Sequence, residues 1–202
     1  VKGFCTENGI EVASTGIQVH GGMGYIEETG AAQTLPDVRI TAIYEGTTGI
    51  QSNDLIGRKV GRDRGPTLPS LLDEMQTSLE SLEPGHATVA SVREAAADAV
   101  ARLRNSSEAL LASLASSPDR AMAVSVPFLK LCALTIGGWL LARTAHIAAG
   151  KLSAGGGDRE FLEGKLATAR FYAAQVLPQV LALEHICVRG SDAVVGTDPA
   201  LI

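Results

Sequence analysis

The 202-residue sequence predicts an all-α protein with a short helical unit first and an antiparallel four-helix bundle after it. Aromatic residues make up only 4% of the chain while Ala and Leu are abundant, which favours helices over a β-sandwich or barrel. Long segments repeat apolar residues at helical spacing, and Pro and Gly clusters separate them. Hydrophobic residues reach 46%, with a mean hydropathy of +0.17, which excludes intrinsic disorder.

The first unit is expected over residues 1–62 and begins with a helix. Cys5, Val12 and Val19 recur at intervals of seven with Gly9 and Gly16 between them, which predicts one packing face that contains small residues. Gly21 and Gly22 end the helix, as glycines commonly do.

The remainder of this unit is less regular. We expect a short helix over residues 26–33 that stops before Pro36, because proline disfavours helical backbone in the residue before it. Residues 39–44 are rich in β-branched and aromatic side chains, which predicts extended or irregular backbone. Thr48 and Gln51 have capping-box spacing, so the sequence predicts a helix from Thr48 to about residue 60.

A charged, Gly/Pro-bounded segment at residues 61–66 predicts a domain boundary, and residues 66–188 then predict the bundle. Breaks at residues 83–85, 117–119 and 155–158 divide it into four amphipathic helices. The third helix is expected to kink at Pro127 and the fourth at Pro178. Residues 189–202 are expected to form a loose tail.

Charge and cysteine content restrict the function class. The net charge is −5, and residues 66–202 hold 11 Lys and Arg against 14 Asp and Glu, so no nucleic-acid partner is expected. Three widely spaced cysteines without metal-ligand spacing indicate a reducing compartment, and we expect a cytoplasmic protein. The apolar stretch 131–142 is shorter than the roughly 20 residues that cross a bilayer, so we expect a buried helix and no membrane span.

The bundle offers few candidates for chemistry. His86, His146 and His185 lie in turns or apolar helical segments and are interpreted as structural, and no metal motif is present. The first unit instead gathers glycines and polar residues in irregular backbone, where N–H groups can approach a ligand closely. Glu45, directly before a predicted helix, is either a charge partner for that helix or a base at the mouth of a pocket.

Three motifs in this unit resemble the acyl-CoA dehydrogenase family. They are Gln18-Val19-His20-Gly21-Gly22-Met23-Gly24-Tyr25, Asp37-Val38-Arg39-Ile40 and Ile43-Tyr44-Glu45-Gly46-Thr47. Their order and spacing match the end of the family's C-terminal helical domain. The continuation over residues 49–59 resembles a longer subgroup, which includes 3-methylmercaptopropionyl-CoA dehydrogenases and carries an extra C-terminal helical domain. The chain also starts without Met and runs directly into helical sequence, so we expect a fragment of such a protein.

The resemblance implies specific roles. Glu45 matches the catalytic base that removes the proton alpha to the thioester carbonyl, while hydride from the beta carbon passes to FAD and yields a trans-2-enoyl-CoA. Tyr44 and Gly46 match positions that border the acyl-CoA. Eight positions match residues that contact FAD in the family: Gln18, Val19, His20, Gly21, Gly22, Thr47, Thr48 and Gly49. The first five match contacts with FAD of a neighbouring subunit.

The resemblance further implies an electron-transfer flavoprotein or another acceptor, and a homodimer or tetramer. The sequence departs from the family pattern at Leu35-Pro36-Asp37, where an Arg-Asp pair is common, and at Gly49, where many members have Gln. The domains that supply most of the flavin site lie outside this sequence, so the isolated chain is expected to be inactive and free of FAD. An acyl-CoA oxidase, or a non-catalytic helical module for assembly or DNA association, remains an alternative.

Overall fold

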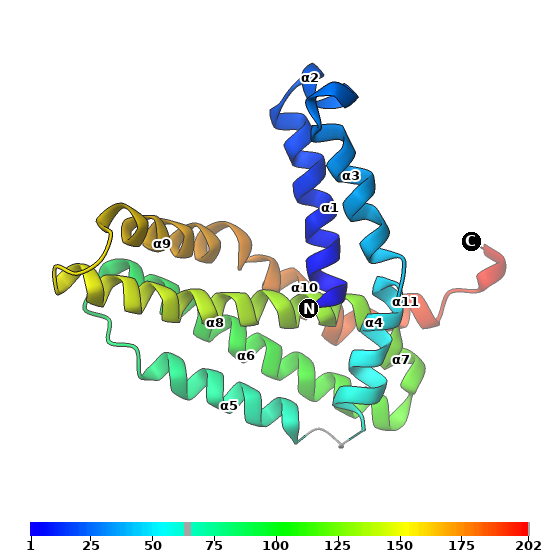
Figure 1. The fold of residues 1–202 in the computed structure, drawn as a ribbon. Helices are drawn as coiled ribbons and strands as arrows, with labels where there is room; N and C mark the ends of the chain where they lie inside the picture. Colours follow the sequence, from blue (N-terminus) through cyan, green and yellow to red (C-terminus); the bar gives the residue numbers. More distant parts are fainter. Residues whose placement is uncertain (63–65, 202) are drawn as a thin grey trace.

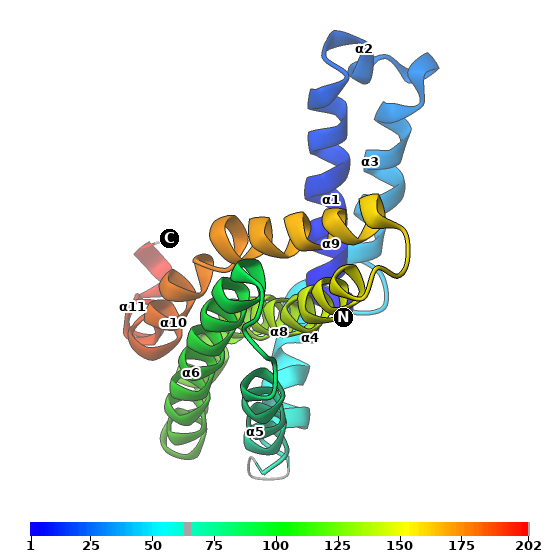
Figure 2. The ribbon, with the colours of Figure 1, turned by 90° about the vertical axis from the view of Figure 1, so that its left-hand side faces the viewer.

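The structure, a computed structural model, describes residues 1–62 and 66–201, and within these residues it contains helices and no β-strand. Figure 1 shows two parts: long helices packed roughly side by side, and a helical hairpin that projects away from them. Figure 2, turned by 90°, shows the same projection of the hairpin. The all-α prediction is therefore confirmed.

The hairpin consists of α1 (Lys2–Val19) and α3 (Ala31–Arg39), with α2 (Gly22–Tyr25) and a 3-10 turn (Glu27–Thr29) at its tip. Close packing along its length is possible because Gly9 lacks a side chain: a Cβ added there would lie 2.8 Å from Val38 Cγ2 of α3. A second 3-10 turn (Ile40–Ala42) and an irregular loop follow α3 at the base.

Two expectations for this region are wrong. The helix does not stop before Pro36, because α3 continues through it to Arg39; the proline removes one backbone hydrogen bond, and the packing of α3 along α1 holds the segment helical. The extended backbone expected as one alternative for residues 39–44 is also absent: Arg39 completes α3, Ile40–Ala42 form the 3-10 turn, and only residues 43 and 44 are irregular, as the other alternative expected.

The predicted packing face of α1 is packed only in part, because Gly9 lies against Val38 of α3 but the larger side chains of the face remain uncovered. Val12 and Val19 are 70% and 79% exposed and Cys5 is exposed, whereas Gly3 and Ala13 are the buried residues of this helix. The difference arises because α3 contacts this face at the small Gly9, while α4 and α8 contact α1 near Gly3.

The chain leaves the hairpin through α4 (Thr48–Asp54), which continues as a π-helical segment (Leu55–Val60). Ile56 and Val60 of this segment are buried in the same apolar core as the bundle helices. The expected helix to about residue 60 is confirmed. Residues 63–65, the centre of the predicted boundary, lie outside the described residues.

The bundle runs back and forth along α5 (Thr67–Glu80), α6 (Ala87–Ser116), α7 (Pro118–Ala123) with α8 (Ser125–Ser153), and α9 (Arg159–Phe171) with α10 (Gln179–Arg189). Its core is apolar, with Leu72, Met75, Leu103 and Phe128 among its fully buried side chains. The third helix breaks at Val124 rather than at Pro127, because Pro127 sits in the first turn of α8, where its missing N–H costs nothing.

The fourth helix bends by 42° between a π-helical segment (Tyr172–Val176) and α10, which confirms the kink near Pro178. The tail differs from expectation. It contains α11 (Ser191–Val195), which packs on α7 with an ion pair of 3.1 Å between Arg120 and Asp192, and a 3-10 turn (Pro199–Leu201).

Helix α8 is 29 residues long and is apolar enough to cross a membrane by length and composition. It is longer than the apolar stretch picked out in the sequence. Leu131, Trp139 and Ala142 of that stretch are nevertheless buried against other helices, and 44% of the most apolar window of α8 is buried within the protein. We therefore interpret α8 as the central core helix of the bundle, as expected.

Candidate functional site

Glu45 lies in a tight turn at the base of the hairpin, between the 3-10 turn Ile40–Ala42 and α4. Its φ is +54°, which makes it the one non-glycine residue with a left-handed backbone among the described residues. Gly46 follows with φ +92°. Left-handed backbone costs an ordinary residue about 1–2 kcal/mol, so neighbouring contacts must hold this turn in place.

Those contacts tie three consecutive backbone carbonyls. Lys2 Nζ donates to both Tyr44 O and Gly46 O at 2.5 Å, and Gln51 Nε2 donates to Glu45 O at 3.1 Å. The Lys2 ammonium also lies 5.6 Å from the centroid of the Tyr44 ring. The turn is thus held from the first residue of α1 on one side and from α4 on the other.

The start of α4 departs from the predicted capping box. Thr47, not Thr48, is the N-cap, and its hydroxyl accepts from Ile50 N at 3.5 Å. Thr48 instead donates to Glu7 Oε1 on α1, at 2.5 Å. Gln51 does not close a box, because its amide turns back to the Glu45 carbonyl.

The side chain of Glu45 is left available by this arrangement. Glu45 is exposed, and among the described residues its carboxylate has no hydrogen-bonding or ionic partner. Large apolar side chains surround the turn and are themselves about half exposed: Ile43 48%, Tyr44 47% and Ile50 59%. A carboxylate edged by exposed apolar groups suits a site that becomes dry once another surface covers it.

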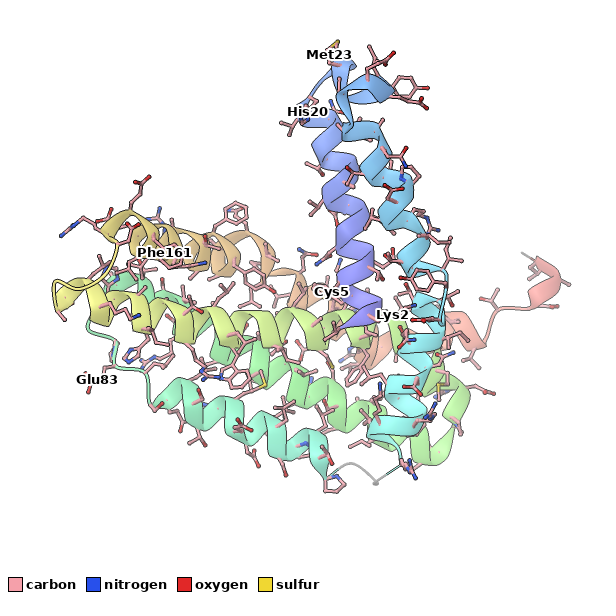
Figure 3. The ribbon with its side chains drawn as sticks, in the orientation of Figure 1. Lys2, Cys5, His20, Met23, Glu83 and Phe161 are labelled. Atoms are coloured by element: carbon pink, nitrogen blue, oxygen red, sulfur yellow. The ribbon has the colours of Figure 1, made fainter. Side chains whose placement is uncertain are left out.

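The glycine-rich motif lies at the opposite end of the hairpin. Gln18, Val19, His20, Gly21 and Gly22 are all exposed at the tip, where Figure 3 labels His20 and Met23. His20 Nδ1 donates to Gly16 O at 2.9 Å, which leaves Nε2 free to accept.

Gly21 has φ +61°, and a Cβ added to Gly21 or Gly22 would meet open space. The backbone of this turn is therefore bare and open to a ligand. Figure 3 shows that this tip lies far from Lys2 and Cys5 at the base. The 18 residues of α1 separate the two ends by about 27 Å at 1.5 Å per residue.

The structure thus brings together one part of the predicted site and keeps the other apart. Tyr44, Gly46, Thr47, Thr48 and Gly49 lie beside Glu45 in the same loop and helix start, whereas residues 18–22 do not approach it. Sequence reasoning missed Lys2 and the true role of Gln51. No local signal identifies Lys2, because its two acceptors lie 42 and 44 residues further along the chain.

Beside the base loop, a groove of about 480 Å³ runs between α1, α4 and α8. Its lining is mixed: Glu7, Glu11 and Lys130 contribute charge, and Phe4 and Leu129 contribute apolar surface. In the bundle, His86 is the N-cap of α6 and its Nδ1 accepts from Thr88 N at 3.2 Å, which confirms its structural interpretation. Across the described ranges no three His, Cys, Asp or Glu side chains are placed to hold a metal ion.

Two family models match the chain. Residues 1–60 match "Acyl-CoA dehydrogenase, C-terminal domain", and residues 71–198 match "Acetyl-CoA dehydrogenase C-terminal like". The first match covers the hairpin with α4, and the second covers nearly all of the bundle with α11.

Individual relatives agree with these matches. The chain is 49% identical to 3-methylmercaptopropionyl-CoA dehydrogenase of Ruegeria pomeroyi over 92% of its own length and 31% of that protein. It is 31% identical to the broad-specificity linear acyl-CoA dehydrogenase FadE5 of Mycobacterium tuberculosis, and 28% identical to a butyryl-CoA dehydrogenase of Syntrophomonas wolfei. These matches cover 92% and 91% of the chain, and 32% and 30% of the relatives.

The chain therefore spans about a third of the length of the relatives it matches, and it corresponds to a C-terminal portion of such a protein. The relatives are named as dehydrogenases of acyl-CoA thioesters, which are oxidoreductases. The domain model, the two-part helical architecture and the level of identity agree on one assignment. The chain belongs to the acyl-CoA dehydrogenase family.

Proposed function

We propose that the full-length protein containing this chain oxidises an acyl-CoA to the trans-2-enoyl-CoA, with Glu45 as the base that removes the alpha proton. The observation that carries this proposal is the turn itself. A carboxylate without a partner stands on left-handed backbone, and three neighbouring carbonyls are tied down around it. Strained backbone that surrounding groups hold in one conformation is typical of functional positions.

The chemistry explains why the base needs such a setting. A proton alpha to a thioester is only weakly acidic, so its transfer to a carboxylate requires close positioning and exclusion of water. Glu45 is exposed in this chain, and the half-exposed Ile43, Tyr44 and Ile50 form an apolar margin around it. We propose that other segments of the full-length protein cover this margin and that Tyr44 and Gly46 border the acyl-CoA.

The residues at the hairpin tip fit one end of FAD. Their turn is exposed and open, since a side chain could be built on Gly21 or Gly22 without meeting another atom, and it would allow a phosphate group to approach the backbone. That end would be held by Gln18, Val19, His20, Gly21 and Gly22. At the opposite end of the hairpin, a cofactor would be approached by Thr47, Thr48 and Gly49. When bound, FAD supplies the acceptor for the hydride that leaves the beta carbon.

The distance between the hairpin tip and Glu45 supports the further proposal that the two ends of one hairpin serve two active centres in a homodimer or tetramer. An electron-transfer flavoprotein or another acceptor would then reoxidise the enzyme. The three cysteines of the chain are free thiols, in keeping with a cytoplasmic location.

The test is Glu45→Gln in the full-length protein, with Glu83→Gln as the matched control because Glu83 is an exposed glutamate between α5 and α6, away from the hairpin (Figure 3). Rapid mixing with saturating acyl-CoA measures flavin reduction. Loss of a general base lowers such a rate by about 10²–10⁴-fold. We therefore expect the rate of flavin reduction in Glu45→Gln to fall by about 10²–10⁴-fold or more, while the variant still binds FAD and acyl-CoA. Reduction at the wild-type rate in Glu45→Gln would refute the assignment of the base.

A further inference from the structure

We propose that Lys2 and Gln51 are positioning residues for the catalytic base: together they hold the Glu45 turn in the conformation that presents its carboxylate. The inference rests on the proposed function of Glu45 and adds two residues from outside the recognised motif. Neither side chain needs to touch substrate or cofactor, because both act on the backbone that carries the base.

Side-chain hydrogen bonds reach all three carbonyls of the Glu45 turn. Tyr44, Glu45 and Gly46 offer three successive carbonyl oxygens, and each accepts a hydrogen bond from a side-chain N–H. A lysine ammonium has three donors and no acceptor, which suits it to bridge two carbonyls that converge across a tight turn. A charged donor also makes a stronger hydrogen bond than a neutral one, so Lys2 is the stronger of the two ties.

Gln51 also packs against the turn, in addition to its hydrogen bond. Its amide lies against the bare Cα of Gly46, where an added Cβ would come within 2.9 Å of Gln51 Nε2. The glycine thus serves two needs at once, since it accepts φ +92° and leaves room for the amide that reaches the Glu45 carbonyl. The same amide would be displaced by any larger residue at position 46.

The helices that carry the two ties are themselves held together. Thr48 of α4 donates to Glu7 of α1, and Gly3 of α1 lies so close to α4 and α8 that an added Cβ would be 3.4 Å from Gln51 Cβ and 3.1 Å from Leu129 Cδ1. Lys2 therefore starts from a fixed position rather than from a loose chain end. A reaction that depends on a near-attack geometry can lose about 10²-fold for a shift of 1 Å in a catalytic group, so this bracing bears directly on rate.

The experiment uses Lys2→Met and Gln51→Met in the full-length protein, because methionine keeps the length and apolar character of each stem and removes the donors. Lys2→Arg restores a charged multiple donor, and Lys151→Met, at the exposed far end of α8, is the matched control. Rapid-mixing flavin reduction gives the limiting rate and the acyl-CoA dissociation constant for each variant. FAD content and the melting temperature are measured alongside.

We expect Lys2→Met to lower the limiting rate by about 10- to 100-fold and Gln51→Met by about 3- to 10-fold, with substrate dissociation constants changed by less than about 3-fold. Lys2→Arg should recover most of the rate, and Lys151→Met should match wild type. An increased dissociation constant with an unchanged limiting rate in Lys2→Met would overturn the inference, as would a failure of Lys2→Arg to recover activity while its FAD content is normal.

The double variant Lys2→Met/Glu45→Gln separates this inference from the function on which it rests. If Lys2 acts through Glu45, the double variant retains the residual rate of Glu45→Gln within about 2-fold, because there is no base left to position. A further 10-fold loss in the double variant would show that Lys2 acts elsewhere and would overturn the positioning role. Wild-type reduction in Glu45→Gln alone would instead refute the proposed function.

Discussion

Three glycine-to-alanine substitutions, two in the hairpin and one in the Glu45 turn, test how the Glu45 turn is held. Gly16 lies inside α1, Gly30 has φ +77° before α3, and Gly46 has φ +92° beside Glu45. An added Cβ meets nothing within 4 Å at Gly16 or Gly30, but at Gly46 it meets Gln51 Nε2 at 2.9 Å and Ile50 Cγ2 at 3.3 Å. The series therefore separates helix propensity, backbone strain, and strain combined with a clash.

The magnitudes follow from these geometries. Gly16→Ala should stabilise α1 by about 0.5–1 kcal/mol, because alanine is the better helix former and has room. Gly30→Ala should cost about 1–2 kcal/mol of backbone strain. Gly46→Ala should cost about 2–3 kcal/mol, since the flexible Gln51 amide moves away and the hydrogen bond to the Glu45 carbonyl, worth about 1 kcal/mol, is lost as well.

Hydrogen exchange followed by mass spectrometry on peptides from α1, α3 and α4 measures these local changes, with about tenfold in exchange rate for each 1.4 kcal/mol. Exchange should be about 2- to 5-fold slower in Gly16→Ala, about 5- to 30-fold faster in Gly30→Ala, and about 30- to 140-fold faster around position 46 in Gly46→Ala. Equal effects of Gly30→Ala and Gly46→Ala would refute the packing of Gln51 on Gly46.

Three further outcomes concern the bundle and the thiols. Phe128→Ala removes a fully buried ring from the core and should lower the free energy of unfolding by about 3–5 kcal/mol in urea titrations, with Phe128→Leu much milder. Burial raises the pKa of Tyr172 to about 12, so its contribution to stability is full below pH 10 and is lost as the pH rises from 10 to about 12; Tyr172→Phe should remove that part of the alkaline transition. Burial likewise raises the pKa of the Cys132 and Cys187 thiols to about 12, so a thiol reagent near pH 8 should modify Cys5 rapidly and the other two only after unfolding.

Much of the bundle was predictable because its signals are local. Apolar residues at helical spacing and Pro or Gly breaks predicted the positions of α5, α6, α8 and α9. The errors occur where a tertiary contact overrides the local signal. Pro36 should have ended a helix, yet α3 continues because it packs along α1, where Gly9 admits Val38.

The candidate site divides along the same line. The motif around Glu45 could be recognised from adjacent residues, but its strained φ and its ties to Lys2 and Gln51 depend on contacts between α1, the loop and α4. The spacing of Thr48 and Gln51 fits a capping box equally well, and only the fold shows that Gln51 reaches the loop carbonyl. Likewise, periodicity predicted the apolar face of Val12 and Val19 without revealing that both side chains are exposed in this chain.

The length of the hairpin leads to a last prediction, on how two subunits share residues. The tip motif and Glu45 are separated by the whole of α1, about 27 Å, so under the proposed function one hairpin serves two active centres. Gly22→Glu should disable the tip by adding charge and bulk where an added Cβ meets open space, leaving the fold intact.

Mixed dimers of Gly22→Glu and Glu45→Gln subunits give the decisive measurement. If the tip serves the neighbouring subunit, a mixed dimer has one centre with both defects and one centre with neither. A random mixture of the two variants should then recover about a quarter of the wild-type flavin-reduction amplitude, because about half of the dimers are mixed and each has one intact centre of two. If the tip and Glu45 of one hairpin serve the same centre, every centre in a mixed dimer carries one defect, and the mixture stays as inactive as the separate variants. Each variant mixed with itself is the control, and inactivity of a mixture whose subunits demonstrably exchange would refute the division of one hairpin between two centres.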